Sequence, residues 1–265
     1  MRAKRGSEEI RNLFNLEGKV AVVTGASGAL GRAVSMGLAV HGVDIVACSN
    51  EQDGLDELAQ EIRETTGRKA LPIFCDVTKT QSVDQMVSRA LAEFGKIDIL
   101  FTAAGMAHRE RLVTMGVDDW QRVMDVNLKG TLICCRAVAK QMIERGKGGS
   151  IITVGSVRGF HAHKDGYTAY GTSKAAVHYL TKQMAFEWAE HNIRVNCIAP
   201  CVFWSPLTEP ILSDKESYQK YTSRIPLGRA AKPEDFIGAT VFLASDASEM
   251  VTAHILSVDG GTVGG

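Results

Sequence analysis

The stretch from Gly149 to Ala176, GSIITVGSVRGFHAHKDGYTAYGTSKAA, decides how the rest of the chain is interpreted. It opens with a β-branched run over residues 151–154, bounded by glycines, which is typical of a buried parallel strand. Such a strand delivers Ser156 to its carboxyl end. Tyr170 and Lys174 follow in an Ala-rich segment, and their spacing of four residues places both side chains on one face of a helix.

The pair of Tyr170 and Lys174 predicts proton-transfer chemistry. A cation held beside a phenol favours the phenolate, so Lys174 is expected to lower the pKa of Tyr170 from its ordinary value of about 10. Such a tyrosine can exchange a proton with an alcohol or carbonyl oxygen. By itself the spacing is a weak signal, because any amphipathic helix can carry such a pair on its surface.

The rest of the chain alternates short apolar runs with amphipathic segments, joined by glycine-marked turns. One helix is expected from about Asp119 to Arg145 and another around Tyr170. This βαβα order predicts an α/β fold, a doubly wound parallel sheet with helices on both faces. Residues 1–16 are expected to form an N-terminal arm, and residues 17–265 a single domain.

Composition narrows the function classes. Thirty basic and thirty acidic residues among 265 give a formal net charge of zero, so we expect no nucleic-acid partner. The six cysteines form no C-x-x-C pair and sit mostly in apolar runs, which indicates reduced, structural thiols. No apolar window is long enough for a membrane span, so we expect a soluble, cytoplasmic protein without a membrane partner.

A glycine-rich turn, TGASGALG at residues 24–31, lies between a predicted strand and a helix, where glycines let a backbone approach a pyrophosphate. With Ser156, Tyr170 and Lys174 in place, the chain closely resembles the classical short-chain dehydrogenase/reductase family from Leu16 to Gly261. Further matches occur in the family's order: Cys75-Asp76-Val77, Thr102-Ala103-Ala104-Gly105, Val126-Asn127, Arg194 to Pro200, and Val258-Asp259-Gly260-Gly261.

The resemblance implies that residues 17–265 are a single Rossmann-type dinucleotide-binding and catalytic domain with a sheet of seven strands. It also implies a role for each catalytic residue. Tyr170 would be the general acid and base, and Lys174 would also bond the nicotinamide ribose. Ser156 would donate to the substrate oxygen, and Asn127 would interrupt its helix to hold a water in a proton relay. The resemblance places an NAD or NADP cofactor against Gly25, Ser27, Gly28, Leu30, Gly31, Ser49, Asn50, Asp76, Val77, Ala104, Gly105, Tyr170, Lys174, Pro200, Val202 and Ser205.

The chain departs from the family pattern at several cofactor positions. These departures are Ala29 for a glycine of the turn, Thr102-Ala103 for two asparagines, Cys201 for a glycine, Ser205 near a threonine, and a 156–170 loop one residue longer than usual. After the second strand, Ser49 and Asn50 are neither acidic, as in NAD-preferring relatives, nor arginine, as in NADP-preferring ones. The missing carboxylate slightly favours NADP, although Glu51 is close enough in sequence to reach the ribose, and both cofactors stay open.

Loops after the strand ends carry the candidate substrate residues. These are Arg158, His161 and Trp204, with His108, Arg109, His163 and Lys164 as further loop groups that are more often simply solvated. The planar fork of Arg158 matches a carboxylate, which favours a small polar substrate such as a sugar acid or a polyol-derived ketone. Spacing supplies no third ligand beside His161 and His163, so we predict no metal site.

The leading hypothesis is an NAD(P)-dependent oxidoreductase that interconverts a secondary alcohol and a ketone by hydride transfer. The alternatives are a 3-oxoacyl thioester reductase of the acyl-carrier-protein type and a cofactor-binding regulator without turnover. A homotetramer is expected, because two helices carry more apolar residues than one sheet face needs. Those residues are Leu132, Ile133, Val138 and Met142 on one helix, and Val177, Leu180, Met184 and Trp188 on the other.

Overall fold

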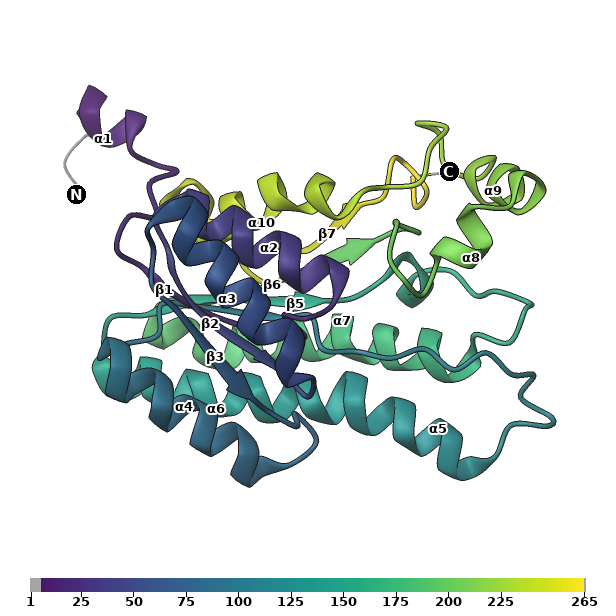
Figure 1. Ribbon diagram of the computed structural model, residues 1–265, viewed down its shortest axis with the longest axis horizontal. Helices are drawn as coiled ribbons and strands as arrows, with labels where there is room; N and C mark the ends of the chain where they lie inside the picture. Colours follow the sequence, from purple (N-terminus) through teal and green to yellow (C-terminus); the bar gives the residue numbers. More distant parts are fainter. Residues whose placement is uncertain (1–5, 265) are drawn as a thin grey trace.

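The computed structural model describes residues 6–264, which form one parallel sheet of seven strands (Figure 1). The strand order is β3-β2-β1-β4-β5-β6-β7, so the chain reverses its direction of travel across the sheet between β1 and β4. This confirms the predicted doubly wound fold. The strands are β1 (Val20–Thr24), β2 (Asp44–Ser49), β3 (Ala70–Phe74), β4 (Ile99–Thr102), β5 (Gly149–Val154), β6 (Ile193–Pro200) and β7 (Ile255–Val258).

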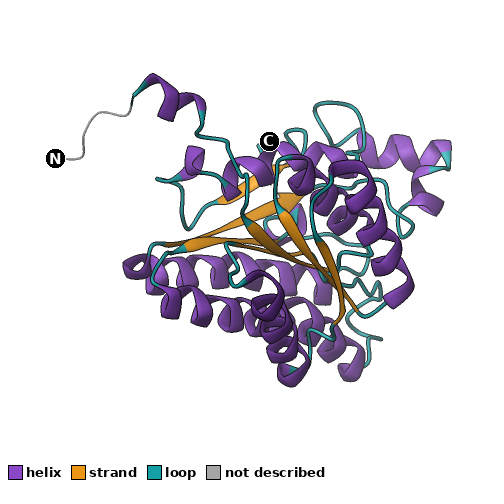
Figure 2. Cartoon of the chain, turned by 60° about the vertical axis from the view of Figure 1, so that its left-hand side comes forward, coloured by secondary structure: helices purple, strands orange, loops and turns teal. Residues whose placement is uncertain are grey.

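Helices cover both faces of this sheet, and Figure 2 shows the strands between two helical layers. The longer helices are α2 (Ala29–Val40), α3 (Gln52–Thr66), α4 (Thr80–Phe94), α5 (Val117–Met124), α6 (Gly130–Arg145), α7 (Thr168–Trp188), α9 (Lys215–Thr222) and α10 (Ile237–Ala244). The shorter ones are α1 (Ser7–Arg11), α8 (Glu209–Leu212) and the 3₁₀ turns η2 (Val157–Gly159), η3 (Ala189–His191), η4 (Pro233–Phe236) and η5 (Asp246–Ser248).

Two hydrophobic cores hold these layers together. On one face, α2, α3 and α10 pack against the sheet, and on the other face α4, α6 and α7 do so. All five residues of β1 are buried, as expected for a strand with helices on both sides. Because the strands are parallel, their carboxyl ends meet at one edge of the sheet, and the turns that leave this edge are where ligands bind in such folds.

A π-helical turn, η1 (Asp125–Lys129), separates α5 from α6. The prediction of one helix from about Asp119 to Arg145 is therefore correct in position but wrong in continuity and in its start, since α5 begins at Val117. The local interruption that the family resemblance implied falls on Asn127, which is buried inside this turn. Such π turns are often found at functional sites.

The N-terminal arm is predicted over residues 1–16, of which residues 1–5 lie outside the described part of the chain. Helix α1 (Ser7–Arg11) stands away from the sheet in Figure 1 and has no buried residue. The chain reaches the body at Phe14, whose ring lies 6.5 Å from the ring of Phe242. Leu16 is already part of a hydrophobic core.

The apolar residues that motivated the oligomer prediction are mostly used inside the subunit. Ile133, Val138, Met142, Val177 and Met184 are buried, because α6 and α7 turn these faces to the sheet and to each other. Leu132 is 41% exposed and is the exception. The apolar side chains that α7 does expose are Tyr179 and Phe186, at 64% and 80%. The predicted surplus was thus largely wrong in its residues.

All six cysteines are free and buried. Burial raises the pKa of each of these thiols, and it is the largest cause in every case. They act as small apolar side chains. In the described part of the chain, no helix is both long and apolar enough to cross a membrane.

Candidate active site

Ser156 lies two residues beyond β5, where the chain turns into η2. The hydroxyl of Ser156 is buried and accepts a hydrogen bond from the backbone N–H of Arg158 at 3.1 Å, which caps η2. One acceptor position of the oxygen is therefore used by the backbone, and the serine proton stays available to another acceptor. The geometry suits a group that donates to a substrate oxygen.

Tyr170 and Lys174 lie on one face of α7, as their spacing predicts. The Lys174 ammonium donates to the backbone oxygen of Val154 at 2.8 Å, and its Nζ lies 5.7 Å from the centroid of the Tyr170 ring. The Tyr170 phenol lies near enough to the Ser156 side chain for that hydroxyl to act on its pKa. The two hydroxyls and the ammonium therefore gather at the end of β5.

Burial changes the ionisation of this pair in a way that the sequence did not predict. It raises the pKa of Tyr170, although the Ser156 hydroxyl and the charge of Arg158 act in the opposite direction. It also lowers the pKa of Lys174 to about 8. The expectation that Lys174 lowers the pKa of Tyr170 is wrong for the protein without ligands, because desolvation is the dominant cause and the ammonium bonds the backbone of Val154 instead.

Asn127 ties three segments together from inside the π turn. Its Oδ1 accepts from the backbone N–H of Met106 at 2.8 Å, and its Nδ2 donates to the Met106 oxygen at 2.9 Å and to Ser173 Oγ at 3.0 Å. Ser173 lies next to Lys174 on α7. The amide thus holds the loop after β4 against the helix that carries the catalytic pair.

His178 is a site residue that sequence reasoning missed. It follows Lys174 by one helical turn on α7 and is 7% exposed, and its Nε2 accepts from the backbone N–H of Ser156 at 3.4 Å. A Cβ added at Gly155 or Gly159 would overlap the imidazole, so the serine turn closes tightly around this ring. Burial, aided by the charge of Lys174, lowers the pKa of His178 to about 4, which keeps it a neutral acceptor.

A pocket at the switch point between β1 and β4 collects most of the predicted cofactor residues. Its lining includes Gly25, Ser27, Gly28, Ser49, Asn50, Asp76, Val77, Ala104 and Gly105. Gly25 has φ +66°, and a Cβ there would lie 2.7 Å from the backbone nitrogen of Ala104. This turn thus requires glycine, and it holds backbone close to the pocket as a pyrophosphate site needs. We conclude that these residues fit a dinucleotide.

The other predicted cofactor residues lie beside this pocket or at the end of β6. Gly31 packs α2 onto the turn, since a Cβ there would overlap the oxygen of Gly25, and Leu30 joins the core. Pro200 ends β6, and the Ser205 hydroxyl is 3.0 Å from that of Thr208. Six lining residues were not assigned to the cofactor from the sequence, although Cys75, Ala103 and Val126 lie in the matched family motifs and Glu51 was considered for the ribose. The six are Glu51, Cys75, Thr78, Ala103, Met106 and Val126.

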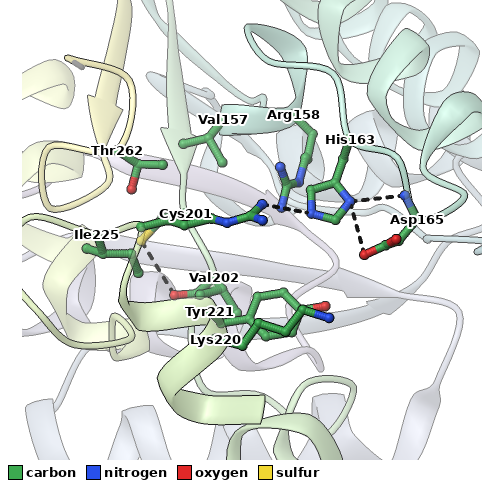
Figure 3. Close-up of a pocket in the computed structure, with 11 residues that line it drawn as sticks. Val157, Arg158, His163, Asp165, Cys201, Val202, Lys220, Tyr221, Ile225 and Thr262 are labelled. Atoms are coloured by element: carbon green, nitrogen blue, oxygen red, sulfur yellow. Dashed lines mark hydrogen bonds and ion pairs between the residues drawn. The ribbon is translucent and has the colours of Figure 1, made fainter. Parts of the chain in front are cut away.

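A second pocket lies at the same edge of the sheet, beyond β5 and β6 (Figure 3). Its lining is Val157, Arg158, His163, Asp165, Cys201, Val202, Lys220, Tyr221, Arg224, Ile225 and Thr262. Of the three predicted substrate residues, only Arg158 lies in it. His161 is exposed, and Trp204 packs with its ring 6.2 Å from that of Tyr218.

Outside both pockets, His108, Glu110 and Asp119 bring three ligand atoms within 4.8 Å of one another. His108 already bonds Glu110 at 3.1 Å, and Asp119 pairs with Arg122 at 2.7 Å. These partners account for the cluster without an ion.

Comparison with known proteins fits this geometry. The family model described as Enoyl-(Acyl carrier protein) reductase matches residues 25–263. The crystal structure of a short-chain type dehydrogenase/reductase from Mycobacterium marinum superposes with a TM-score of 0.91 at 37% identity, covering 96% of this chain and 98% of that one. The chain belongs to the classical short-chain dehydrogenase/reductase family.

Two other family members carry more specific names. The 2-dehydro-3-deoxy-D-gluconate 5-dehydrogenase of Escherichia coli (strain K12) is 40% identical over 256 residues, 95% of this chain and 98% of that protein. A gluconate 5-dehydrogenase from Burkholderia cenocepacia J2315, solved in complex with NADP and tartrate, superposes with a TM-score of 0.91 at 34% identity, covering 96% of this chain and 98% of that one.

As a member of the short-chain dehydrogenase/reductase family, the protein is an NAD(P)-dependent oxidoreductase. The nicotinamide supplies or accepts the hydride when it is bound. The glycine turn and the ends of β2 and β4 are the residues that fit the dinucleotide.

Proposed function

We propose that the protein interconverts a secondary hydroxyl and a ketone on a small sugar acid, with Tyr170 as the proton-transfer group. The observation that carries this is the pair of neighbouring hydroxyls, Ser156 and Tyr170, at the end of β5 beside a pocket lined by Arg158. In reduction, the Tyr170 phenol gives its proton to the developing alkoxide, and in oxidation it takes the proton back.

The other three residues support that transfer. Ser156 donates to the same oxygen, because its hydroxyl already accepts from Arg158 N–H. Lys174 is assigned to the nicotinamide ribose, and its ammonium is next to the cofactor pocket, where a Cβ on Gly105 would lie 3.6 Å from Nζ. Asn127 is assigned to the proton relay, with its amide fixed between Met106 and Ser173.

Two features support a sugar acid as the substrate class. The second pocket contains guanidinium and ammonium groups, which suit a carboxylate. The relatives from Escherichia coli and Burkholderia cenocepacia are named for sugar acids, and the latter was crystallised with tartrate, a dicarboxylate. Arg158 is our candidate for the acid group, with His161 and Trp204 assigned to the outer wall.

The test compares Arg158→Ala with the wild type on two matched ketones, one with a carboxylate and one without. We expect kcat/KM to fall about 10- to 100-fold on the acid and much less on the neutral ketone, because the lost contact is a charge-assisted hydrogen bond. An equal loss on both substrates would show that Arg158 is structural and would remove the support for an acidic substrate.

A 3-oxoacyl thioester reductase is the second candidate, because the matching family model carries an acyl-carrier-protein name. A panel of sugar acids, polyol-derived ketones and 3-oxoacyl thioesters, followed by cofactor oxidation, separates the two activities. Turnover of the thioester alone would favour the second candidate. No turnover with any of them, but intact cofactor binding, would favour a regulator.

The side chains at the adenosine end of the cofactor pocket support binding of NADP and also of NAD. Ser27 and Ser49 share a hydrogen bond of 2.6 Å there, and Glu51 Oε2 lies 3.4 Å from Ser27 Oγ. The hydroxyls can bond a 2′-phosphate or a 2′-hydroxyl. Glu51 is exposed, so its repulsion of a phosphate is screened by solvent.

A homotetramer in the cytoplasm completes the proposal. The exposed rings of Tyr179 and Phe186 on α7, with Leu132 on α6, offer an apolar face for helix-on-helix contact between subunits. The free, buried thiols fit a reducing compartment. Light scattering should give about four times the 28.6 kDa of one chain, and a monomer at working concentration would refute the assembly.

A further inference from the structure

The second pocket contains more positive charge than its own residues neutralise. Arg158, Lys220 and Arg224 line it, and the one carboxylate in the lining is Asp165. Arg158 comes from η2, two residues after Ser156, while Lys220 lies on α9 and Arg224 follows it. Figure 3 shows the side chain of Arg158 above the pocket and that of Lys220 below it.

Neither guanidinium is neutralised within residues 6–264, since neither forms an ion pair with a carboxylate there. Arg224 makes its polar contact with His163, and the carboxylate of Asp165 lies 3.7 Å from that same imidazole. Burial lowers the pKa of Arg158, and the nearby charge of Arg224 contributes. Arg158 is partly buried and Arg224 and Lys220 are exposed, so the pocket presents like charges that an anion from solvent can join.

His163 gives a second, independent sign of a missing acceptor. Its Nδ1 faces the backbone N–H of Asp165 at 3.2 Å, and its Nε2 faces a guanidinium N–H of Arg224 at 3.3 Å. A neutral imidazole can accept at only one nitrogen. Burial and three surrounding arginines lower the pKa of His163, so the ring is neutral near pH 7. One of these two N–H groups therefore finds no acceptor on the ring.

Aromatic contacts hold Arg158 in place beside the reacting groups. Its Cζ lies 5.2 Å from the centroid of the Tyr167 ring, with Arg109 Cζ at 5.0 Å from the same centroid. The Tyr167 ring in turn lies 6.3 Å from that of Tyr170. A guanidinium stacked in this way loses little side-chain entropy on binding.

We propose that Arg158 and Arg224 form a two-sided carboxylate site, with Lys220 at its rim, that binds the acid group of the substrate. The inference rests on the proposed function and deepens it, because it assigns the acid group to a site that includes Arg224, a residue 66 positions from Arg158. A carboxylate bound there contacts both the segment that follows α9 and the turn that carries Ser156.

The experiment measures binding and turnover separately. Calorimetric titration of tartrate gives its dissociation constant, and steady-state kinetics compare gluconate with the neutral polyol sorbitol. Arg224→Ala should weaken tartrate binding and raise KM for gluconate about 10- to 100-fold, the loss expected for a charge-assisted hydrogen bond. KM for sorbitol should change less than about twofold.

Two further variants control for folding and for general charge. Arg224→Lys keeps the charge but not the fork, so it should recover part of the tartrate affinity. Lys215→Ala removes one cation from the exposed start of α9, outside the pocket lining, and should leave tartrate binding unchanged. An equal effect of Lys215→Ala and Arg224→Ala would indicate a general field and would overturn the site.

The outcomes also separate this inference from the proposed function. If tartrate binding depends on Arg224 but no sugar acid is turned over, the anion site stands and the proposed substrate is wrong. If gluconate is turned over and Arg224→Ala changes acid and neutral substrates equally, the function stands and the site is wrong. Tighter binding of inorganic phosphate than of tartrate would overturn the carboxylate assignment.

Discussion

Two pockets open at the same edge of the sheet, and they handle negative charge by different means. The cofactor pocket is lined by backbone, hydroxyls and the acidic side chains Glu51 and Asp76, with no lysine or arginine in its described lining. The second pocket is lined by Arg158, Lys220 and Arg224. A pyrophosphate can be held by backbone N–H groups that a fixed turn aims at it, whereas a small free acid needs side-chain charge.

The difference has a structural cause. The cofactor pocket is built from turns that leave adjacent strands, so its donors are part of the sheet and helix framework. The second pocket is assembled from η2 with the adjoining loop before α7, from the residues that follow β6, and from the α9 segment, which comes more than 50 residues later in the chain. We infer that the first pocket is preformed by the fold, and that the second depends on an anion to balance its cations.

The largest expected effect is at Tyr170, which lies between the two pockets. The neighbours of its ring are Lys174 on the side of the cofactor pocket and Tyr167 on the side of the second pocket. Tyr170→Phe should lower kcat about 10³-fold, because it removes the transferable proton, and should leave the affinities for cofactor and tartrate nearly unchanged. Single-turnover kinetics and titrations measure the two effects. Tyr179→Phe, on the exposed face of α7, is the control.

A substitution at Gly25 should damage the cofactor pocket alone. Gly25→Ala places a methyl against the backbone of Ala104 at φ +66°, so we expect cofactor affinity to fall at least about tenfold, with strain of about 1–2 kcal/mol. Gly67→Ala is the control: its φ of +69° gives a similar backbone strain, but a Cβ there would have no atom within 4 Å. Tartrate binding should survive both changes, and its loss in Gly25→Ala would show that the two pockets are coupled.

His178 should give the protein a pH dependence of stability that is independent of either pocket. Its pKa is about 4 in the folded protein and about 6.5 when unfolded, so stability is complete above the unfolded value and is lost as the pH falls towards 4. Between about pH 7.5 and about pH 5 the loss should be about 2 kcal/mol. Urea unfolding at the two pH values measures this loss, which should be absent in His178→Leu. His191→Gln, near the helix end, should show the same loss as the wild type.

The smallest effect is expected at the adenosine end of the cofactor pocket. Glu51→Gln removes a carboxylate that would face a 2′-phosphate, so affinity for NADP relative to NAD should rise about 3- to 10-fold. Fluorescence titration with both reduced cofactors measures the ratio. Glu57→Gln changes the same charge on α3 outside the pocket lining and should leave the ratio unchanged.

The predictions that succeeded used local spacing. A four-residue interval placed Tyr170 and Lys174 on one helical face, because a regular element fixes the direction of its side chains. The family resemblance then linked this pair to Ser156 at the end of a buried strand. The glycine-rich turn was also placed correctly, because it lies between a regular strand and a regular helix. The parallel sheet followed from the alternation of apolar runs with helices.

The features that the sequence did not predict depend on how side chains pack and on how much solvent reaches them. Arg224 could not be paired with Arg158 from sequence, because only the path of the chain around α9 brings them to one pocket. His178 looks like any polar residue of an amphipathic helix until Gly155 and Gly159 are seen to close on its ring. The ionisation of Tyr170 was predicted from its neighbour alone, and burial outweighs that neighbour.

The buried cysteines have a practical consequence for handling and labelling. Because the thiolate is the reactive form, thiols whose pKa burial has raised react slowly with alkylating reagents while the protein is folded. The rate of modification therefore reports how often the chain opens. Cys75 and Cys201 differ from the other four cysteines, because Cys75 lines the cofactor pocket and Cys201 lines the second pocket. Added dinucleotide should slow alkylation of Cys75, and an added acid should slow alkylation of Cys201. Each rate then reports the occupancy of one pocket without an introduced label.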